Sequence, residues 1–171
     1  MRPVKELAAI ARKLDPFAFT KQMGPFVLMQ RPVTAAPTGA DWMASTAKLP
    51  SASVVKEKLE PIEVEELLIA TLPPPQKDGS LQLVVGRALD CDVVVDDPAV
   101  SLKHAAILWD GRAGLLRELG SSNGTFVNGM RIGSRAALRT GDDLSFGKTH
   151  FVYLLTSELY ATLIKKQPKK K

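Results

Sequence analysis

Residues 86–129 read GRALDCDVVVDDPAVSLKHAAILWDGRAGLLRELGSSNGTFVNG, a stretch in which short apolar runs alternate with glycines, hydroxyls and charged side chains. The apolar runs are too short to be helices, so the polar groups between them are expected at strand ends and in turns. Binding residues concentrate in loops that a rigid scaffold holds in place. An arginine, several hydroxyls and side-chain amides gathered there would suit an anion.

Further short runs of apolar or alternating residues lie on both sides of this stretch. The whole set covers residues 64–72, 81–85, 93–95, 105–109, 115–119, 125–127, 144–146 and 151–155. Turn-forming pairs such as Asp110-Gly111, Asn123-Gly124 and Asn128-Gly129 separate the runs. Many short strands with such turns predict an all-β protein, a sandwich or barrel of antiparallel sheets.

The N-terminal part follows a different pattern. Apolar residues from Val4 to Leu14 recur at helical spacing, and Asp15-Pro16 is expected to stop this helix. An apolar segment follows up to residue 31, interrupted by Gly24-Pro25, so it cannot be one continuous element. It either packs on its own domain or binds a partner.

The remaining segments give the predicted domain boundaries. Residues 1–31 form the N-terminal helix and apolar segment, and residues 32–60 form a linker rich in Pro, Ala and Thr with a weak helix. The β domain covers residues 61–156. Residues 157–171 form a C-terminal extension, in which 157–164 are a short helix or a continued strand and the rest is a lysine-rich tail.

The net charge of +5 does not indicate a nucleic-acid-binding domain once it is divided by region. Residues 1–60 carry a net charge of +4 and residues 165–171 carry +5, which leaves −4 on residues 61–164. A domain that binds nucleic acid should carry positive charge on its own folded surface. Nucleic acid is therefore not the expected partner. A nucleic-acid-associated protein that binds through its basic ends is the third hypothesis.

The single cysteine, Cys91, cannot form an internal disulfide and fits a reducing compartment. Charged residues interrupt the N-terminal apolar run, which argues against a signal peptide. No apolar run is long enough to span a membrane. The sequence therefore predicts a soluble cytoplasmic protein without membrane partners.

The motif residues resemble those of the forkhead-associated (FHA) domain. The resemblance rests on Gly86-Arg87, Ser101-x-x-His104, Ser122-Asn123-Gly124-Thr125, Asn128-Gly129 and Gly141-Asp142-x-Leu144-x-x-Gly147, and it covers about residues 64–156. It implies a bacterial-type single-domain protein with a short, partly helical N-terminal extension. The implied fold is an FHA-like sandwich of two antiparallel sheets, whose loops at one end bind phosphothreonine in an extended peptide.

The resemblance assigns the contacts with the phosphopeptide. Arg87 would offer a planar donor fork to the phosphate, in a charge-assisted geometry that lysine cannot copy. Ser101 and Ser122 would donate hydroxyl groups to the same phosphate. Asn123 would hold the peptide main chain through its amide donor and acceptor. Capture of phosphopeptides around an arginine is a recognised binding mode, of which this family is an example.

Other residues have alternative or supporting parts. Ser121 could replace Ser122 after a small register change, and Lys103 would add positive potential if it faces the site. The residues expected to support the site structurally are Gly86, His104, Gly124, Thr125 and Asn128. Gly86 is expected to supply backbone freedom, His104 to buttress the loop of Ser101, and Asn128 to brace the turn of Asn123. Leu102 departs from the family, which commonly has arginine or asparagine there.

These residues predict a phosphothreonine-binding adaptor in Ser/Thr kinase signalling, whose partners are the kinase or its substrates. An alternative is a protein-interaction scaffold that binds without phosphate and uses the N-terminal segment. Self-association through that segment is a further hypothesis, because Thr38 is followed three places on by Asp41, a position such domains often read. Phosphorylated Thr38 could then fold back on its own site or bridge two chains.

Nothing in the chain predicts an enzyme, a cofactor or a metal. The stretch from Gly141 to Thr149 imitates a phosphate-binding P-loop but has five residues between its glycines instead of four. Ser101 and His104 lack the nucleophile elbow and a third member of a hydrolase triad. Cys91, His104 and His150 are too scattered for a zinc site.

Overall fold

The computed structural model describes residues 2–30, 68–70, 72 and 79–165. The strands are β1 (Arg2–Pro3), β2 (Phe26–Gln30), β3 (Leu68–Ile69), β4 (Leu81–Gly86), β5 (Val93–Val94), β6 (Ala105–Trp109), β7 (Gly114–Glu118), β8 (Thr125–Val127), β9 (Met130–Arg131), β10 (Arg135–Leu138), β11 (Asp143–Phe146) and β12 (Thr149–Leu155). The helices are α1 (Val4–Ala11), α2 (Pro16–Met23) and α4 (Thr156–Lys165). None of the described helices is long and apolar enough to cross a membrane.

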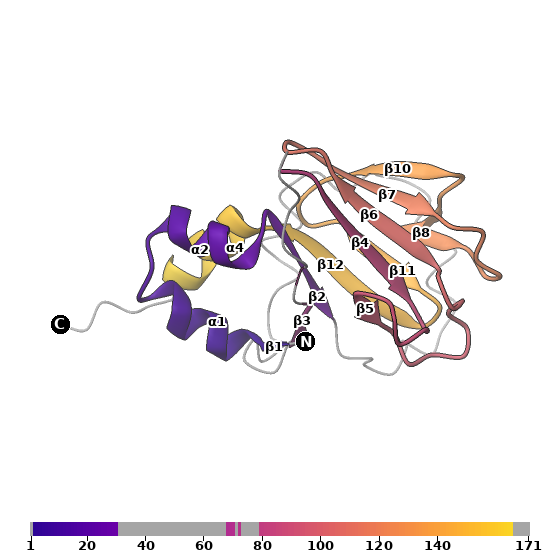
Figure 1. Ribbon diagram of the computed structural model, residues 1–171, viewed down its shortest axis with the longest axis horizontal. Coiled ribbons are helices and arrows are strands. Elements are labelled where there is room, and N and C mark those ends of the chain that lie inside the picture. The colour runs from indigo at the N-terminus through magenta and orange to yellow at the C-terminus, as the bar shows by residue number, and fades with distance from the viewer. Residues whose placement is uncertain (1, 31–67, 71, 73–78, 166–171) are drawn as a thin grey trace, which may run out of the picture.

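The strands form two packed sheets (Figure 1). Sheet A has the order β1-β3-β2-β12-β11-β8-β9, and sheet B has the order β10-β7-β6-β4-β5. The predicted all-β sandwich is confirmed. One pair departs from the antiparallel prediction, since β5 runs parallel to β4, with Val85 opposite Val93.

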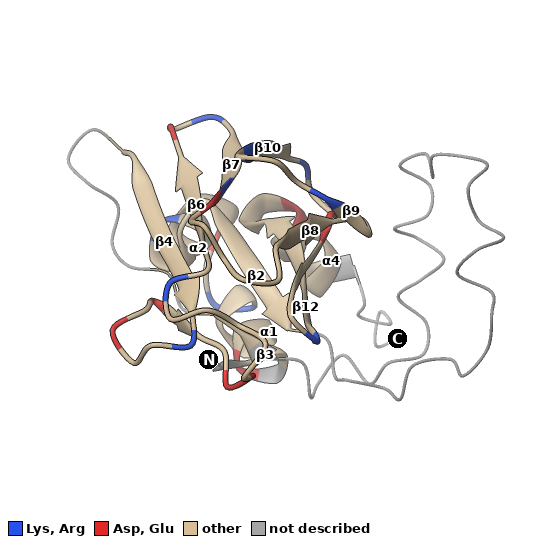
Figure 2. Cartoon of the chain, turned by 90° about the vertical axis from the view of Figure 1, so that its right-hand side faces the viewer, with Lys and Arg blue, Asp and Glu red and all other residues tan. Residues whose placement is uncertain are grey.

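The loops at one end of the sandwich lie away from the helices, and Figure 2 faces this end. They join β4 to β5, β5 to β6, and β7 to β8. The helices α1, α2 and α4 stand at the other end, beside β2 and β12 (Figure 1). The motif residues from Gly86 to Gly124 therefore belong to a part of the molecule that the helices leave open.

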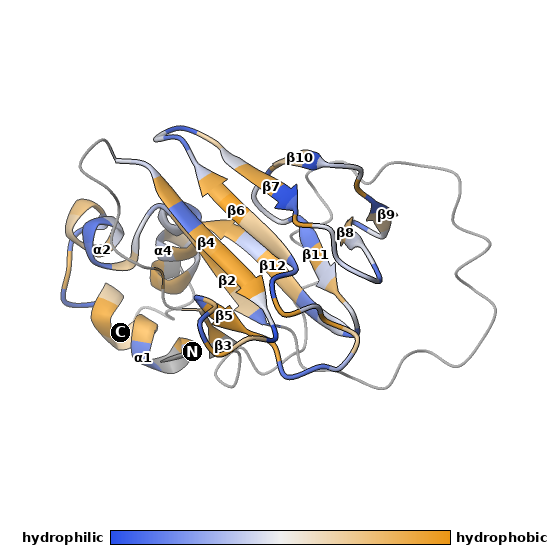
Figure 3. Ribbon diagram, turned by 45° about the vertical axis from the view of Figure 1, so that its right-hand side comes forward, coloured by the Kyte–Doolittle hydropathy of each residue, from blue (hydrophilic) through white to orange (hydrophobic). Residues whose placement is uncertain are grey.

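Two apolar clusters hold these layers together. The first lies between the sheets and includes Phe26, Leu28, Phe151 and Tyr153. The second lies between sheet A and the helices and includes Val27, Met29, Val152, Leu154 and helix residues such as Leu7 and Phe19. Successive side chains of a strand point to opposite faces, so β2 and β12 contribute to both clusters. This explains why β2 is a continuous apolar run, which is coloured hydrophobic along most of its length in Figure 3.

Strand β2 makes the N-terminal segment part of the sandwich. It pairs with β12, with Leu28 opposite Tyr153, and with β3 on its other side. The sandwich thus includes a strand from before residue 61, the predicted start of the β domain. Of the two alternatives for this apolar segment, the structure shows packing on its own domain.

The N-terminal helical region has one helix more than predicted. The first helix already ends at Ala11, before the predicted stop at Asp15-Pro16, and these two residues start α2. Asp15 is the N-cap and accepts hydrogen bonds from the backbone N–H groups of Phe17 and Ala18 at 2.9 and 3.0 Å, and Pro16 occupies the first turn. Gly24 ends α2 with a positive φ of 84°.

The C-terminal extension is a helix, which settles the alternative that the sequence left open. Tyr160 of α4 donates a hydrogen bond to the backbone carbonyl of Leu14 at 3.0 Å, and its ring lies 5.3 Å from that of Phe19. The two ends of the chain are thus joined in one helical layer. The predicted linker at 32–60, its weak helix and the tail after residue 165 lie outside the described residues.

Candidate phosphopeptide site

The loops from β4 to β5 and from β5 to β6 lie side by side through backbone hydrogen bonds. Arg87 N–H donates to the carbonyl of Ser101 at 2.9 Å, and Ala88 N–H donates to that of Leu102 at 3.1 Å. Arg87 and Ser101 are 14 positions apart in the sequence, and these bonds hold them together at the end of the sandwich that lies away from the helices.

Gly86 is required because the two loops approach so closely. A Cβ at this position would lie 2.2 Å from the Leu102 carbonyl oxygen and 2.9 Å from Cys91 Sγ. The sequence analysis expected Gly86 to supply backbone freedom, but its φ is not among the positive values of the described residues. The physical reason for this glycine is therefore space.

The Arg87 side chain is exposed and only partly engaged. Its Nε donates to the carbonyl of Val100 at 3.2 Å, which points the guanidinium along the neighbouring loop. A guanidinium has five N–H donors, so this bond fixes the side chain and leaves the terminal nitrogens for a ligand. No described residue pairs with them. Such a fork matches the geometry of phosphate oxygens.

Ser101 and Ser122 come together across the loops. The backbone N–H of Ser122 donates to Ser101 Oγ at 3.0 Å. Ser101 Oγ acts as an acceptor in this bond, which leaves its proton for a further acceptor. Ser122 itself is exposed. The two hydroxyl groups are therefore neighbours, next to the loop that carries Arg87.

Asn123 connects the same two loops from the other side. Its Nδ2 donates to the carbonyl of Ala99 at 2.7 Å, while the side chain remains exposed. This bond uses one of its two N–H donors. The amide oxygen and the second N–H remain for a peptide main chain.

His104 lies beneath the site and is fully buried. Its Nδ1 accepts a hydrogen bond from the backbone N–H of Ser101 at 3.2 Å. The proton of the ring must then be on Nε2, which lies 3.1 Å from the Gly124 carbonyl and donates to it. One ring thus sets the distance between the loop of Ser101 and the turn that carries Asn123, and it also packs edge-on against Phe146 at 5.6 Å.

Ser121 has a structural position in this arrangement. Its hydroxyl donates to Glu118 at 3.1 Å and accepts the Gly124 N–H at 3.0 Å, while its backbone N–H donates to Glu118 at 2.7 Å. Burial alone would raise the pKa of Glu118, but hydrogen bonds to its carboxylate, first of all from Ser121 N–H, lower the pKa overall. Ser121 therefore braces the turn, whereas the side chain of Ser122 is exposed.

Asn128 and Gly124 support other parts of the loop end. Asn128, at φ 52°, binds the Asp142 carboxylate at 2.8 Å and the Asp143 N–H at 3.0 Å. These bonds brace the β8–β9 hairpin against β11, whereas the sequence analysis expected Asn128 to brace the turn of Asn123. Gly124 has φ 84°, and a Cβ there would lie 2.4 Å from Arg131 Nε. Thr125 is fully buried at the start of β8.

Lys103 and Leu102 are both exposed beside the site. Lys103 Nζ lies 3.3 Å from the Asp90 carboxylate, so part of its charge is compensated by that neighbour. Leu102 is 60% exposed, which places an apolar side chain immediately after Ser101. The positive potential expected from Lys103 is therefore weaker than its formal charge.

The sequence analysis did not single out Asp97. Asp97 is buried, and its carboxylate accepts the N–H groups of Ala99 and Lys148, both at 2.8 Å. These hydrogen bonds, that of Lys148 first, lower the pKa of Asp97. A Cβ on Gly147 would lie 2.7 Å from this carboxylate.

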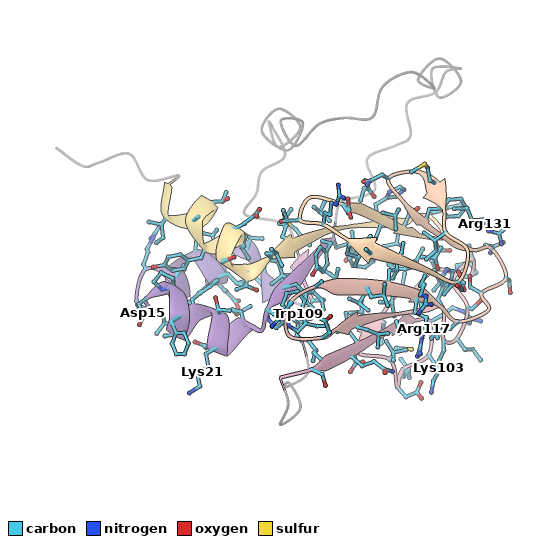
Figure 4. The ribbon with its side chains drawn as sticks, turned by 90° about the horizontal axis from the view of Figure 1, so that it is seen from above. Asp15, Lys21, Lys103, Trp109, Arg117 and Arg131 are labelled. Atoms are coloured by element: carbon cyan, nitrogen blue, oxygen red, sulfur yellow. The ribbon has the colours of Figure 1, made fainter. Side chains whose placement is uncertain are left out.

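Three arginines near the loop end were also missed. Arg117 lies in β7, Arg131 in β9 and Arg135 in β10, and all three are exposed. Figure 4 shows Arg117, Arg131 and Lys103 at the same end of the molecule, far from Lys21 and Asp15 of the helical region. Figure 2 shows basic segments along the strands β7, β9 and β10 that carry these arginines. No sequence motif contains these arginines. The register of β7 and β10 places Arg117 opposite Arg135, whereas Arg131 lies in the other sheet.

Comparison with known proteins decides the family. The family model of the FHA domain matches residues 83–147, the part of the chain that contains the three loops. This part of the chain is an FHA domain. It runs from β4 to the turn after β11 and includes His104, Asn123 and Gly147.

Two relatives are similar to part of this chain. GarA, the glycogen accumulation regulator of Mycolicibacterium smegmatis, is 39% identical over 69 residues, which cover 40% of this chain and 43% of that protein. An ABC transporter ATP-binding/permease protein of Mycobacterium tuberculosis is 33% identical over 123 residues, 72% of this chain and 13% of the relative. The chain thus matches less than half the length of either relative.

A solved FHA domain, that of FhaA in complex with the intracellular domain of another protein, is 29% identical with a TM-score of 0.44. The similarity covers 50% of this chain and 87% of that one.

Proposed function

We propose that the FHA domain of this chain binds phosphothreonine in a partner protein, and that Arg87, Ser101, Ser122 and Asn123 make the contacts. The observation that carries the proposal is the placing of Arg87 beside Ser101 and Ser122, with its terminal nitrogens not engaged by a described residue. The phosphate would accept charge-assisted hydrogen bonds from the guanidinium and further bonds from the two hydroxyl groups. Asn123 would bind the main chain next to the phosphothreonine.

FHA domains are interaction modules, and we propose that this protein acts as an adaptor without catalytic activity of its own. Its partners would be a Ser/Thr kinase or the proteins which that kinase phosphorylates. GarA, with which the chain shares its FHA domain, is named as a regulator. We place this activity in the cytoplasm, where the free thiol of Cys91 persists and kinases meet their substrates.

The supporting residues act through the loops. His104 and Asp97 hold the loop of Ser101, Glu118 and Ser121 hold the turn of Asn123, and none of these four side chains needs to touch the peptide. Lys103 is a weaker contributor because Asp90 compensates it.

Titration of a phosphothreonine peptide library tests the proposal. Arg87→Ala should reduce the affinity of the best phosphopeptide by at least about tenfold, because it removes the charge-assisted bonds to the phosphate. Arg87→Lys should recover only part of the loss, since an ammonium lacks the planar fork. Arg139→Ala serves as the control, because Arg139 is an exposed arginine that follows β10 at the opposite end of the sandwich.

The alternative is an interaction scaffold that does not depend on phosphate, and the exposed apolar side chains of Leu89 and Leu102 beside the loops give it a physical basis. Binding of the unphosphorylated peptide with the same affinity, unchanged in Arg87→Ala, would replace the adaptor proposal with this one.

A further inference from the structure

Arg117 and Arg135 stand directly opposite each other on adjacent strands. Their Cα atoms are register partners in the antiparallel pair of β7 and β10. Both side chains are exposed, and neither forms an ion pair with any residue of the described ranges. Like charges directly opposite each other in a sheet are destabilising. An anion between them would convert this repulsion into attraction.

The two arginines face away from the core of the sandwich. Leu116, which directly precedes Arg117 in β7, and Leu138, three positions after Arg135 in β10, are buried in the cluster between the sheets. Since side chains alternate along a strand, Arg117 and Arg135 point to the outer face of sheet B. The described helices pack on sheet A instead.

The row that contains the two arginines continues across sheet B with apolar residues. Arg117 is opposite Ala106 of β6, and Ala106 is opposite Val84 of β4. Leu108 and Leu115 form the adjacent row and are half-buried. The outer face is thus largely apolar apart from the exposed Gln82 opposite Leu108, with two cations at its β7–β10 side, a composition suited to an extended acidic chain.

This face is continuous with the phosphopeptide loops. Arg117 is followed by Glu118, whose carboxylate holds Ser121, and Glu118 N–H donates to the carbonyl of Ser134 at 3.0 Å, next to Arg135. Ser122 lies only five positions after Arg117. An extended chain advances about 3.3 Å per residue, so an acidic residue within roughly five positions of a bound phosphothreonine could reach the arginines.

We infer that the outer face of sheet B is a second contact surface for the same partner, and that Arg117 and Arg135 together bind an acidic side chain of that partner. The inference rests on the proposed function of the loops. The ligand chemistry is a carboxylate or a second phosphate near the phosphothreonine. This second contact surface adds affinity for partners whose phosphorylated segment is acidic.

Fluorescence anisotropy with the full chain tests this inference. One phosphothreonine peptide has neutral flanks, and its matched derivatives carry two glutamates, or one phosphoserine, two to five residues before or after the phosphothreonine. The acidic derivatives on one side should bind roughly three- to tenfold more tightly than the neutral peptide. Arg117→Gln combined with Arg135→Gln should remove this gain and leave the affinity for the neutral peptide unchanged.

Arg112→Gln combined with Arg139→Gln is the matched control, because it removes the same charge from exposed arginines at the opposite end. This control should keep the gain. The inference is overturned if acidic flanks give no gain on either side, or if the control removes the gain as fully as the Arg117 and Arg135 variant does. A gain with glutamate as well as phosphoserine identifies the subsite as one for any anion, and a gain with phosphoserine alone identifies it as a phosphate subsite.

A failure of the proposed function is distinguishable. If no phosphothreonine peptide binds the wild type, the proposed function fails, and an unphosphorylated hexaglutamate peptide is then titrated against the arginine Nε–H signals in NMR spectra. Shifts confined to Arg117 and Arg135 would keep the second surface. Shifts spread over all exposed arginines, or no shifts, would overturn it.

Discussion

Asp97 and Lys148, 51 positions apart in the sequence, are joined by a hydrogen bond of 2.8 Å from the Lys148 backbone N–H to the Asp97 carboxylate. The other oxygen of that carboxylate holds Ala99 N–H at 2.8 Å. A single buried acid thus fixes the loop that precedes Ser101 to the turn between β11 and β12. The position of Ser101 depends on this anchor, although Asp97 lies outside the proposed phosphate-binding residues.

Asp97→Asn should destabilise the protein by about 2 to 3 kcal/mol, because one charge-assisted bond becomes neutral and the amide group turns a donor toward an N–H. Denaturant unfolding followed by tryptophan fluorescence measures the change. Asp96→Asn is the control, since Asp96 is exposed, and a surface substitution should stay within about 0.5 kcal/mol. Equal losses in the two variants would contradict the anchoring role.

Protonation of Asp97 and Glu118 at low pH should reduce the stability of the folded protein. Both have a pKa lowered in the folded protein, so each contributes stability above the pKa of its unfolded state. This contribution should fall as the pH drops from about 5 through the lowered native pKa values. Unfolding measured at several pH values should therefore show that wild type and Asp97→Asn differ most near neutral pH and converge in acid. A constant difference across this range would contradict the assignment.

The sequence located most strands because turns bound them on both sides. The predicted strands at 105–109 and 125–127 coincide with β6 and β8. Strand β2 was not predicted because it is buried on both faces and therefore shows no alternation of apolar and polar residues. Its pairing with β12 also joins distant parts of the chain. Helix α2 was not predicted because Asp15-Pro16 was interpreted only as the end of one helix, although an Asp followed by Pro is also a helix N-terminal signal.

In the site, as in the fold, local sequence patterns could be recognised, but contacts between distant residues could not. The residues around Arg87 and Ser101 carry a recognisable spacing, so the sequence alone was enough to predict them as a site. The hydrogen bond that turns the Ser121 hydroxyl toward the Glu118 carboxylate, and so favours Ser122 as the proposed ligand contact, is not revealed by spacing. The pairing of Arg117 with Arg135 depends on strand register. The net negative charge of residues 61–164 gives no sign of this local pair of positive charges.

Gly86→Ala should disturb both stability and binding. The added Cβ would meet the backbone carbonyl of Leu102 at 2.2 Å, and a backbone atom cannot move aside as the end of a side chain can. We expect a loss of about 1 to 3 kcal/mol or more and weaker phosphopeptide binding, because Arg87 and Ser101 would be displaced. Gly133→Ala is the control, since a Cβ there meets nothing within 4 Å. Thermal unfolding and peptide titration of both variants check the expectation.

His104→Phe should weaken phosphopeptide binding although the ring need not touch the peptide. Phenylalanine can fill the space beside Phe146 but leaves the Ser101 N–H and the Gly124 carbonyl without their buried partner. Each unpaired group costs about 1 to 3 kcal/mol if the loops stay in place, so the loops should separate instead. His150→Phe is the matched control, because His150 is exposed on β12 and binds Asp143. Backbone amide spectra should show changes at Ser101 and Gly124 in the first variant only. An unchanged affinity together with these spectral changes would mean that binding does not depend on the distance which His104 sets between the two loops.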